Sequence, residues 1–157
     1  MERLGEMTKG LLKAVDEGNW REIERLVHLG GNLNAAYDPF GNTPFLHAMQ
    51  LFKKAEDIER LIKLGGDVTY KNRAGRTALM VAVGNGCEAI TPWVMVDYGA
   101  DINAQDALGN TALMICLESE LYTKKLLYAL IDYGADLTNL KNKEGKTAFD
   151  MLYDKFE

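Results

Sequence analysis

The chain has 157 residues, of which 47% are hydrophobic and 26% charged, and this composition is typical of a globular protein long enough for one domain with a buried core. Its net charge of −5 argues against a general nucleic-acid binder, because affinity for phosphates needs concentrated Lys and Arg. The first ten residues contain no apolar stretch of a secretory signal, and the longest apolar runs, 78–83 and 126–131, are too short to span a bilayer.

The chain contains two cysteines, Cys87 and Cys116, and both lie in apolar surroundings. Buried, reduced thiols of this kind are typical of proteins inside the cell, where disulfides are rare. A disulfide between the two stays an open alternative, since sequence alone does not decide pairing. We expect a cytoplasmic protein that carries no membrane segment and binds no nucleic acid.

The first predicted elements are two helices within residues 4–29, separated by the turn "DEGNW" at 16–20. No turn of the kind that recurs later in the chain precedes them. We therefore expect residues 1–30 to form a helical cap at the N-terminal end of the fold. An array of stacked units needs a polar outer face at each end, and the charged residues near both termini predict such faces.

From residue 38 onward, one turn sequence recurs, as "DPFGNT", "NRAGRT", "DALGNT" and "NKEGKT". Its threonines follow one another at intervals of 34 to 36 residues: Thr43, Thr77, Thr111 and Thr147. A glycine after an apolar run keeps nearly the same period: Gly30, Gly65, Gly99 and Gly134. Two independent markers with one period indicate a repeat protein.

Each unit reads as a turn followed by two helices. Asp or Asn opens the turn because its side chain can bond nearby backbone N–H groups, and the glycine three residues later accepts a positive φ. The threonine then stands at the N-cap of a short apolar helix, as Thr43 does before Pro44. A second helix with spaced apolar residues follows, for example across 55–64, and a glycine such as Gly65 ends it.

This unit resembles the ankyrin repeat, which consists of a β-turn and two antiparallel helices and carries the signature T-P-L-H-x-A. Thr43, Pro44 and Ala48 match the signature, with Phe45 in the place of Leu. The endings "GADIN" and "GADLT" are similar to the Gly-Ala-Asp-Val-Asn ending of the family. The resemblance implies an all-α fold, a solenoid of ankyrin repeats with a helical N-terminal cap and a truncated C-terminal repeat.

We expect one domain over residues 1–157, made of the cap, three full repeats and a final partial repeat that lacks its second helix. The predicted boundaries of the repeats are 31–65, 66–99, 100–134 and 135–157. The histidine of the family signature is missing, and other residues hold its place: Leu46, Met80, Met114 and Asp150. Packing and the threonine hydroxyls must therefore supply more of the rigidity of the turns.

No pattern in the chain points to catalysis or to a cofactor. The histidines, His28 and His47, lie in different units and have no Cys-x-x-Cys or His-x-x-x-His beside them, which argues against a zinc site. Nothing in the repeat places Cys87 or Cys116 beside a histidine for nucleophilic catalysis, and no phosphate-binding glycine motif occurs. We expect a protein that is not an enzyme and that holds no cofactor and no metal.

The resemblance implies that recognition uses the tips of the turns and the nearby ends of the first helices, which line the concave face of such a solenoid. The predicted partner-binding set consists of the residues at these positions: Tyr37, Pro39, Phe40, Asn42, Gln50, Leu51, Tyr70, Lys71, Arg73, Arg76, Asn85, Gln105, Leu108, Asn110, Glu118, Lys141, Lys143 and Lys146.

Two features of this set go beyond the background. Tyr37 and Phe40 put aromatic rings into a turn that polar residues normally fill, and Tyr70 and Leu108 extend this apolar track. Six basic residues also lie at the tips, and such a basic rim favours an acidic segment on a partner: Lys71, Arg73, Arg76, Lys141, Lys143 and Lys146. Rings that pack on the neighbouring turn and tips that are merely solvated stay open alternatives.

We expect a monomeric, non-catalytic module that binds a partner protein with its concave face, as an adaptor or as a stoichiometric inhibitor. Two alternatives stay open. One is the sequestration of a small anionic ligand or nucleotide in the concave groove by the basic tips. The other is a structural subunit of an oligomer, stacked through its truncated C-terminal end.

Overall fold

The computed structural model describes the backbone of residues 2–157 and the side chains of residues 5–157. Within this range the chain forms helices joined by turns and loops, with one isolated antiparallel bridge between Lys141 and Thr147. None of these helices combines the length and hydropathy that a membrane span requires. The helices are α1 (Glu2–Asp16), α2 (Trp20–His28), α3 (Pro44–Leu51), α4 (Ala55–Lys63), α5 (Ala78–Gly84), α6 (Thr91–Asp97), α7 (Ala112–Glu118), α8 (Lys124–Asp132) and α9 (Ala148–Phe156).

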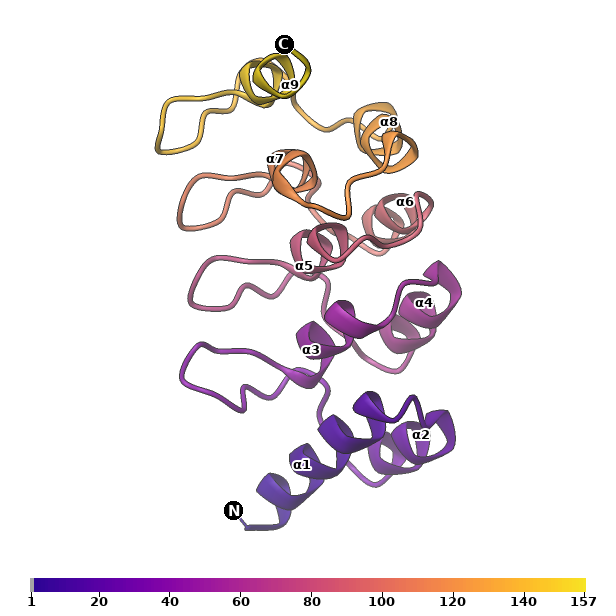
Figure 1. The fold of residues 1–157 in the computed structure, drawn as a ribbon. Helices are drawn as coiled ribbons and strands as arrows, with labels where there is room; N and C mark the ends of the chain where they lie inside the picture. Colours follow the sequence, from indigo (N-terminus) through magenta and orange to yellow (C-terminus); the bar gives the residue numbers. More distant parts are fainter. Residues whose placement is uncertain (1) are drawn as a thin grey trace.

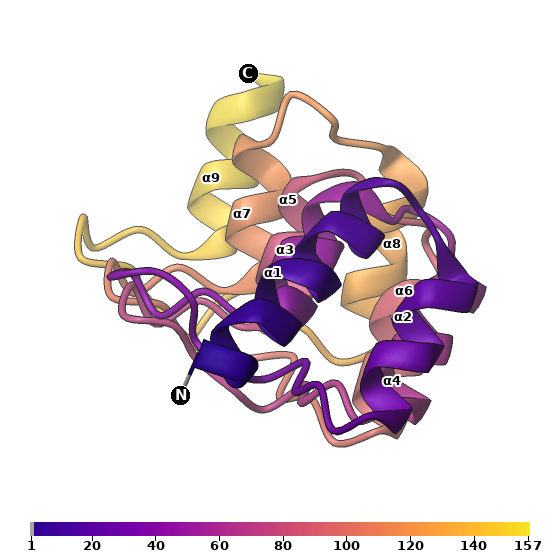
Figure 2. The same cartoon turned by 90° about the horizontal axis from the view of Figure 1, so that it is seen from below.

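The helices stand in two columns (Figure 1). The inner column contains α1, α3, α5, α7 and α9, each in contact with the next, and the outer column contains α2, α4, α6 and α8. Seen along the stack in Figure 2, the loops that lead into the inner helices project to one side. The two ends of the chain lie at opposite ends of the stack. The predicted all-α solenoid of ankyrin repeats is confirmed.

The helix boundaries follow from the residues that the sequence places there. The inner helices α3, α5, α7 and α9 each begin at a threonine whose hydroxyl accepts the N–H three residues later, at 3.1 to 3.4 Å. Pro44 stands in the first turn of α3, where its missing N–H costs nothing. The outer helices end at glycines with φ between 99° and 112°: Gly30, Gly65, Gly99 and Gly134.

Apolar side chains of the two columns meet between them and form one continuous core. Outer helices contribute residues such as Ile58 and Leu61 of α4, which are fully buried. Inner helices contribute the residues two and six positions after each N-cap threonine, which are buried in the first three repeats: Phe45 and Met49, Leu79 and Val83, Leu113 and Leu117.

The two ends of the stack differ, and the prediction of polar faces at both ends is wrong at the C-terminal end. At the N-terminal end, α1 exposes Lys9 and Lys13. At the other end, α9 has no outer helix paired with it within residues 2–157, and it exposes Phe149, Tyr153 and Phe156. Charged residues alternate with these rings along α9, so their number near the terminus did not reveal the apolar side of the helix.

Candidate functional site

The loops that project from the inner column form a row of fingers, which carry most of the predicted partner-binding residues (Figure 1). A backbone hydrogen bond from the Tyr37 N–H to the Asn42 carbonyl, at 2.9 Å, closes the first finger, and bonds of 2.9 to 3.1 Å close the others. We define the fingers by residue numbers: finger 1 is 32–43, finger 2 is 66–77, finger 3 is 100–111 and finger 4 is 135–147.

Each finger turns around an Asp or Asn side chain, as predicted. In finger 3, Oδ1 of Asp106 accepts hydrogen bonds from the N–H groups of Leu108 and Asn110, both at 2.9 Å. These bonds fix the backbone of the tip and leave the side chain of Leu108 free to point outward. Three other side chains accept the equivalent pairs of bonds at 2.9 to 3.0 Å: Asp38, Asn72 and Asn142.

Neighbouring fingers are tied together through their backbones. The N–H of Arg73 donates to the carbonyl of Phe40 at 3.0 Å, and bonds of 2.8 and 2.9 Å join finger 3 to finger 2 and finger 4 to finger 3. Gly75 permits this approach, because a Cβ there would lie only 2.9 Å from the backbone nitrogen of Ala107. The tips therefore form one connected row and not a set of independent loops.

Side chains form a second line of contacts between the fingers. Fingers 1 and 2, and likewise fingers 3 and 4, are joined by a hydrogen bond between two side-chain amides, at 3.0 and 3.1 Å. Fingers 2 and 3 are joined by an ion pair at 3.8 Å. An amide pair and an ion pair thus perform the same task at equivalent positions of the stack. The pairs are Asn72 with Asn42, Asp106 with Arg76, and Asn142 with Asn110.

Several residues of the predicted partner-binding set are engaged in such contacts within the fold. Asn42 and Asn110 belong to the amide pairs, and Asn110 is buried. Tyr70 donates its hydroxyl to a carbonyl of finger 1 at 2.6 Å, and Gln105 donates its amide to carbonyls of fingers 3 and 4 at 2.8 and 3.0 Å. Asn85, at the end of α5, donates to a carbonyl of that helix at 2.8 Å. The side chains of Asn42, Tyr70, Gln105 and Asn110 position the fingers, whereas that of Asn85 bonds within its own helix, and the contact of all five with a partner stays a prediction.

The most exposed apolar side chains of the fingers are those of Phe40 and Leu108, which are 68% and 60% accessible. Both stand two residues after the Asp that organises the turn, on finger 1 and finger 3. Pro39 is exposed beside Phe40. The packing alternative therefore does not hold for Phe40, whose ring lies mostly in solvent.

Tyr37 is more enclosed than Phe40, with 38% of its surface accessible. Its ring meets that of His47 edge-on, with ring centroids 6.3 Å apart, and Nε2 of His47 lies 2.7 Å from Oδ1 of Asp16. Desolvation, followed by the charges of Asp38 and Asp16, raises the pKa of the Tyr37 hydroxyl. Tyr37 therefore links finger 1 to α1 and α3 and is in part a packing residue.

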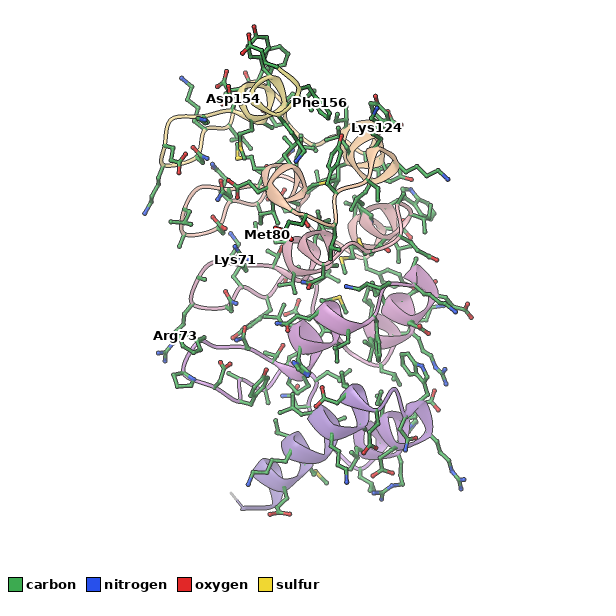
Figure 3. All side chains as sticks on the ribbon, in the orientation of Figure 1. Lys71, Arg73, Met80, Lys124, Asp154 and Phe156 are labelled. Atoms are coloured by element: carbon green, nitrogen blue, oxygen red, sulfur yellow. The ribbon has the colours of Figure 1, made fainter. Side chains whose placement is uncertain are left out.

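The basic tips divide into free and paired side chains. Lys146 is paired, with Nζ 2.7 Å from Oδ2 of Asp154, and this hydrogen bond raises the pKa of the lysine. Arg76 is paired with finger 3, as described above. Figure 3 shows Arg73 at the outer end of finger 2, farther from the helices than Lys71. Four basic residues are exposed and have no ion-pair partner among residues 5–157: Lys71 and Arg73 on finger 2, and Lys141 and Lys143 on finger 4.

The remaining members of the predicted set lie away from the fingers. Gln50 and Leu51 are exposed at the end of α3, and Glu118 is exposed at the end of α7. The N-terminal ends of these helices adjoin the fingers, so a helix of about 10–12 Å separates the two groups. The structure therefore does not bring these three residues together with Phe40 and Leu108, and only a large partner could contact both groups.

The nucleophilic and metal-binding residue types are dispersed. Cys87 and Cys116 are free thiols, and burial raises their pKa to about 11 and to about 12, so that both are protonated at neutral pH. Nδ1 of His28 lies 2.7 Å from the carbonyl of Glu24, on the outer column. Across residues 5–157, no three His, Cys, Asp or Glu side chains gather in a group that could hold a metal ion.

One apolar surface is absent from the predicted set. Phe149, Tyr153 and Phe156 of α9 and Tyr128 of α8 are each more than half exposed. The repeat period contains a signal for it, because Phe149 and Tyr153 stand at positions that are core in the earlier repeats.

Comparisons with known proteins agree with this architecture. A family model described as ankyrin repeats in three copies matches residues 11–106. Human ankyrin repeat and SOCS box protein 6 is 30% identical over 152 residues, which cover 93% of this chain and 35% of that protein. The neurogenic locus Notch protein of Drosophila melanogaster is 31% identical over 115 residues, 73% of this chain and 4% of its own. The nuclear factor NF-kappa-B p105 subunit of Gallus gallus is 28% identical over 153 residues, 96% of this chain and 14% of its own. The chain thus spans about a third of the first relative and less of the others.

Proposed function

We propose that this chain, which belongs to the ankyrin-repeat family, binds another protein through its finger tips and the exposed ends of its inner helices. It would act without catalysing a reaction, as an adaptor or as a stoichiometric inhibitor. Ankyrin repeats are in general protein-interaction modules. The observation that carries the proposal is the connected row of tips, which holds the exposed Phe40 and Leu108 on a fixed backbone.

The chemistry of the tips alternates along the row. Fingers 1 and 3 present the apolar side chains of Phe40 and Leu108, whereas fingers 2 and 4 present unpaired basic side chains such as Arg73 and Lys143. A partner that fits this row carries acidic groups between apolar ones. Because the tips are already ordered by hydrogen bonds, binding need not include the cost of ordering loops.

The two kinds of contact would contribute differently to binding. An exposed aromatic ring that becomes buried at the centre of an interface is a typical hot spot and mainly slows dissociation. The unpaired Lys and Arg side chains would accelerate encounter with an acidic surface, and this effect weakens as salt screens the charges. The chain as a whole has a net charge of −5, so these basic finger tips are a local feature and the remaining residues are together negative.

A capture experiment with a matched control tests the proposal. The immobilised wild-type chain, the double variant Phe40→Ala with Leu108→Ala, and the control Phe156→Ala are each exposed to the native cell extract. A protein retained by the wild type and the control is then purified and its affinity is measured by titration. We expect the double variant to bind it at least about tenfold more weakly, since hot-spot residues contribute about 2 kcal/mol or more.

The stability of the variants decides how that result is interpreted. Both replaced side chains are mostly exposed, so the free energy of unfolding should change by less than about 0.5 kcal/mol. Equal affinity of the wild type and the double variant for the purified protein would contradict the proposal. A large loss of stability would show instead that these side chains support the fold.

The alternative of a small anionic ligand has less support. The unpaired basic side chains are split between finger 2 and finger 4, with Leu108 of finger 3 between them, so they do not converge on one anion. Calorimetric titration with nucleotides should therefore give no heat of binding.

We also propose a cytoplasmic location, supported by the free, buried thiols of Cys87 and Cys116.

A further inference from the structure

The four fingers are of two kinds, which alternate along the row. Fingers 1 and 3 contain no basic residue, and their turns read "DPFGN" and "DALGN". Fingers 2 and 4 contain three basic residues each, and their turns read "NRAGR" and "NKEGK". The chemistry of the tips therefore repeats after two fingers, although the fold repeats after one.

Contacts between the fingers explain one part of this alternation. The residue that opens each turn and the residue after its glycine bond to a neighbouring finger. Asn72 donates its side-chain amide to Asn42 at 3.0 Å, whereas Asp106 forms its ion pair with Arg76. Asp before and Asn after the tip of one finger thus match Arg and Asn on the adjoining fingers. These two positions alternate because the fold pairs them.

Other exposed side chains of the tips alternate without any such pairing. Phe40 and Leu108 are the exposed apolar side chains of fingers 1 and 3. At the tips of fingers 2 and 4, the basic residues on both sides of the opening Asn are exposed and have no ion-pair partner among residues 5–157: Lys71, Arg73, Lys141 and Lys143. Pairing between the fingers does not require this second part of the alternation, so it points to a molecule that binds along the row.

The spacing of the tips sets the kind of chain that fits them. The inner helices of successive repeats pack against each other, and helices packed in this way lie about 8–10 Å apart. One finger leads into each helix from α3 to α9, and backbone hydrogen bonds of 2.8 to 3.0 Å join each tip to the next (Figure 1). Successive tips are therefore about 10 Å apart, which is the length of three residues in an extended chain.

A helix on the partner fits this row less well than an extended segment. At about 1.5 Å per residue, a helix needs about seven residues to reach from one tip to the next and about 22 to cover all four. It would meet the row with only one residue in every two turns. An extended segment reaches the four tips with about ten residues, so it makes the same contacts over less than half the length.

Charge selects the register in which such a segment binds. In the matching register, its carboxylates meet the basic fingers and its apolar side chains meet Phe40 and Leu108. A shift by one finger would bring the carboxylates toward Asp38 and Asp106, which open the turns of fingers 1 and 3. It would also cover basic side chains with apolar ones. Both changes weaken binding, because like charges repel and a covered cation loses its water.

We propose that the row of finger tips binds an extended acidic segment of a partner protein, in which apolar and acidic residues alternate at intervals of three. The pattern is Φ-x-x-E-x-x-Φ-x-x-E, where Φ is an apolar residue and E stands for Glu or Asp. This inference rests on the proposed function and names its partner by chemistry. Finger 2 is the stronger basic site, because Glu144 stands beside Lys143 at the tip of finger 4.

A labelled synthetic peptide tests the proposal with the whole chain. It has thirteen residues, with Glu at the first, seventh and last positions, Phe at the fourth and tenth, and Ser elsewhere, so it fits the row in both directions. Fluorescence anisotropy at about 0.1 M salt, where charges more than about 10 Å apart are screened, should show saturation below about 1 mM. A control peptide of the same composition, with its Glu and Phe only two residues apart, should bind at least about fivefold more weakly, because its side chains are out of step with the tips.

Two variants of the chain that lose the same charge locate the bound peptide. Lys71→Ala with Arg73→Ala, on finger 2, should weaken it about two- to tenfold, the range expected for two exposed ion pairs. Lys124→Ala with Lys125→Ala is the matched control and should bind like the wild type. Both of these lysines are exposed on α8, and Figure 3 shows Lys124 in the outer column, away from the fingers.

A third variant tests the order of the two basic fingers. Lys141→Ala with Lys143→Ala, on finger 4, should weaken the peptide less than the finger 2 variant does. It also replaces that variant if the circular dichroism spectrum shows that the finger 2 variant is unfolded. Unchanged affinity of both finger variants would overturn the proposal, as would an equal loss in the α8 control.

Three results with the peptides would also overturn the proposal. The first is no binding of the alternating peptide at about 1 mM. The second is equal binding of the control peptide, which would show attraction without spacing. The third is tighter binding of a helical peptide of about 22 residues that carries Glu and Phe seven apart. The proposed function fails separately, only if Phe40→Ala with Leu108→Ala leaves the affinity for the captured protein unchanged.

Discussion

Replacing the finger-tip glycines by alanine tests whether the fingers are held together as the structure describes. The glycine of each turn has a φ between 71° and 77°, for which alanine costs about 1–2 kcal/mol because of its own Cβ. This part of the cost is shared by all the tips. The four glycines are Gly41, Gly75, Gly109 and Gly145. They differ in the atoms that a Cβ added at each position would contact.

Gly75 is the most crowded of these positions together with Gly109. A Cβ at Gly75 would lie 2.9 Å from the backbone nitrogen of Ala107, closer than real Cβ atoms approach, and 3.1 Å from backbone atoms of Asp106. Finger 3 would have to move away, which breaks the 2.8 Å bond from the N–H of Ala107 to finger 2. This loss adds about 1–2 kcal/mol, so that Gly75→Ala costs about 2–4 kcal/mol in all.

Gly145→Ala is the matched control, because a Cβ at this tip meets nothing within 4 Å. Its cost should remain about 1–2 kcal/mol. Urea unfolding followed by circular dichroism measures the free energy of unfolding of both variants, and their melting temperatures should differ by about 2–8 °C. Equal losses for Gly75→Ala and Gly145→Ala would refute the reasoning, since the contact between fingers would then contribute nothing.

Two further predictions concern the core and the last helix. Burial raises the pKa of Cys87 to about 11 and that of Cys116 to about 12. Both thiols should therefore react with a thiol reagent at about pH 8 only as fast as the chain opens. Rapid labelling of the native chain would contradict their burial. Thr147→Ala should remove the capping box of α9, cost about 1 kcal/mol and reduce hydrogen-exchange protection in that helix alone. Hydrogen bonds from the N–H and the hydroxyl of Thr147 lower the pKa of the Asp150 carboxylate, so the part of the capping box that these two bonds form is complete above the ordinary pKa of 3.8 and is lost as the pH falls below it. Protection of α9 that does not change on acidification would contradict that assignment.

The turns and helix starts could be predicted because their chemistry is local. The side chain of Asp106 bonds N–H groups two and four residues later, and Thr111 caps the helix that it precedes. Such bonds depend on a few neighbouring residues, and they recur in each unit. The repeat period then gave the fold, because the recurrence of one turn and two helices leaves stacking as the way to bury their apolar sides.

The exposure of individual residues could not be predicted in the same way, because it depends on residues about 34 positions away. Asn110 and Leu108 are both tip residues, yet Asn142 of the next finger covers the first and leaves the second in solvent. Tyr70 was expected in an apolar track, and its hydroxyl instead bonds finger 1. The sequence identifies the positions that flank a turn, but the neighbouring finger decides which of them are free.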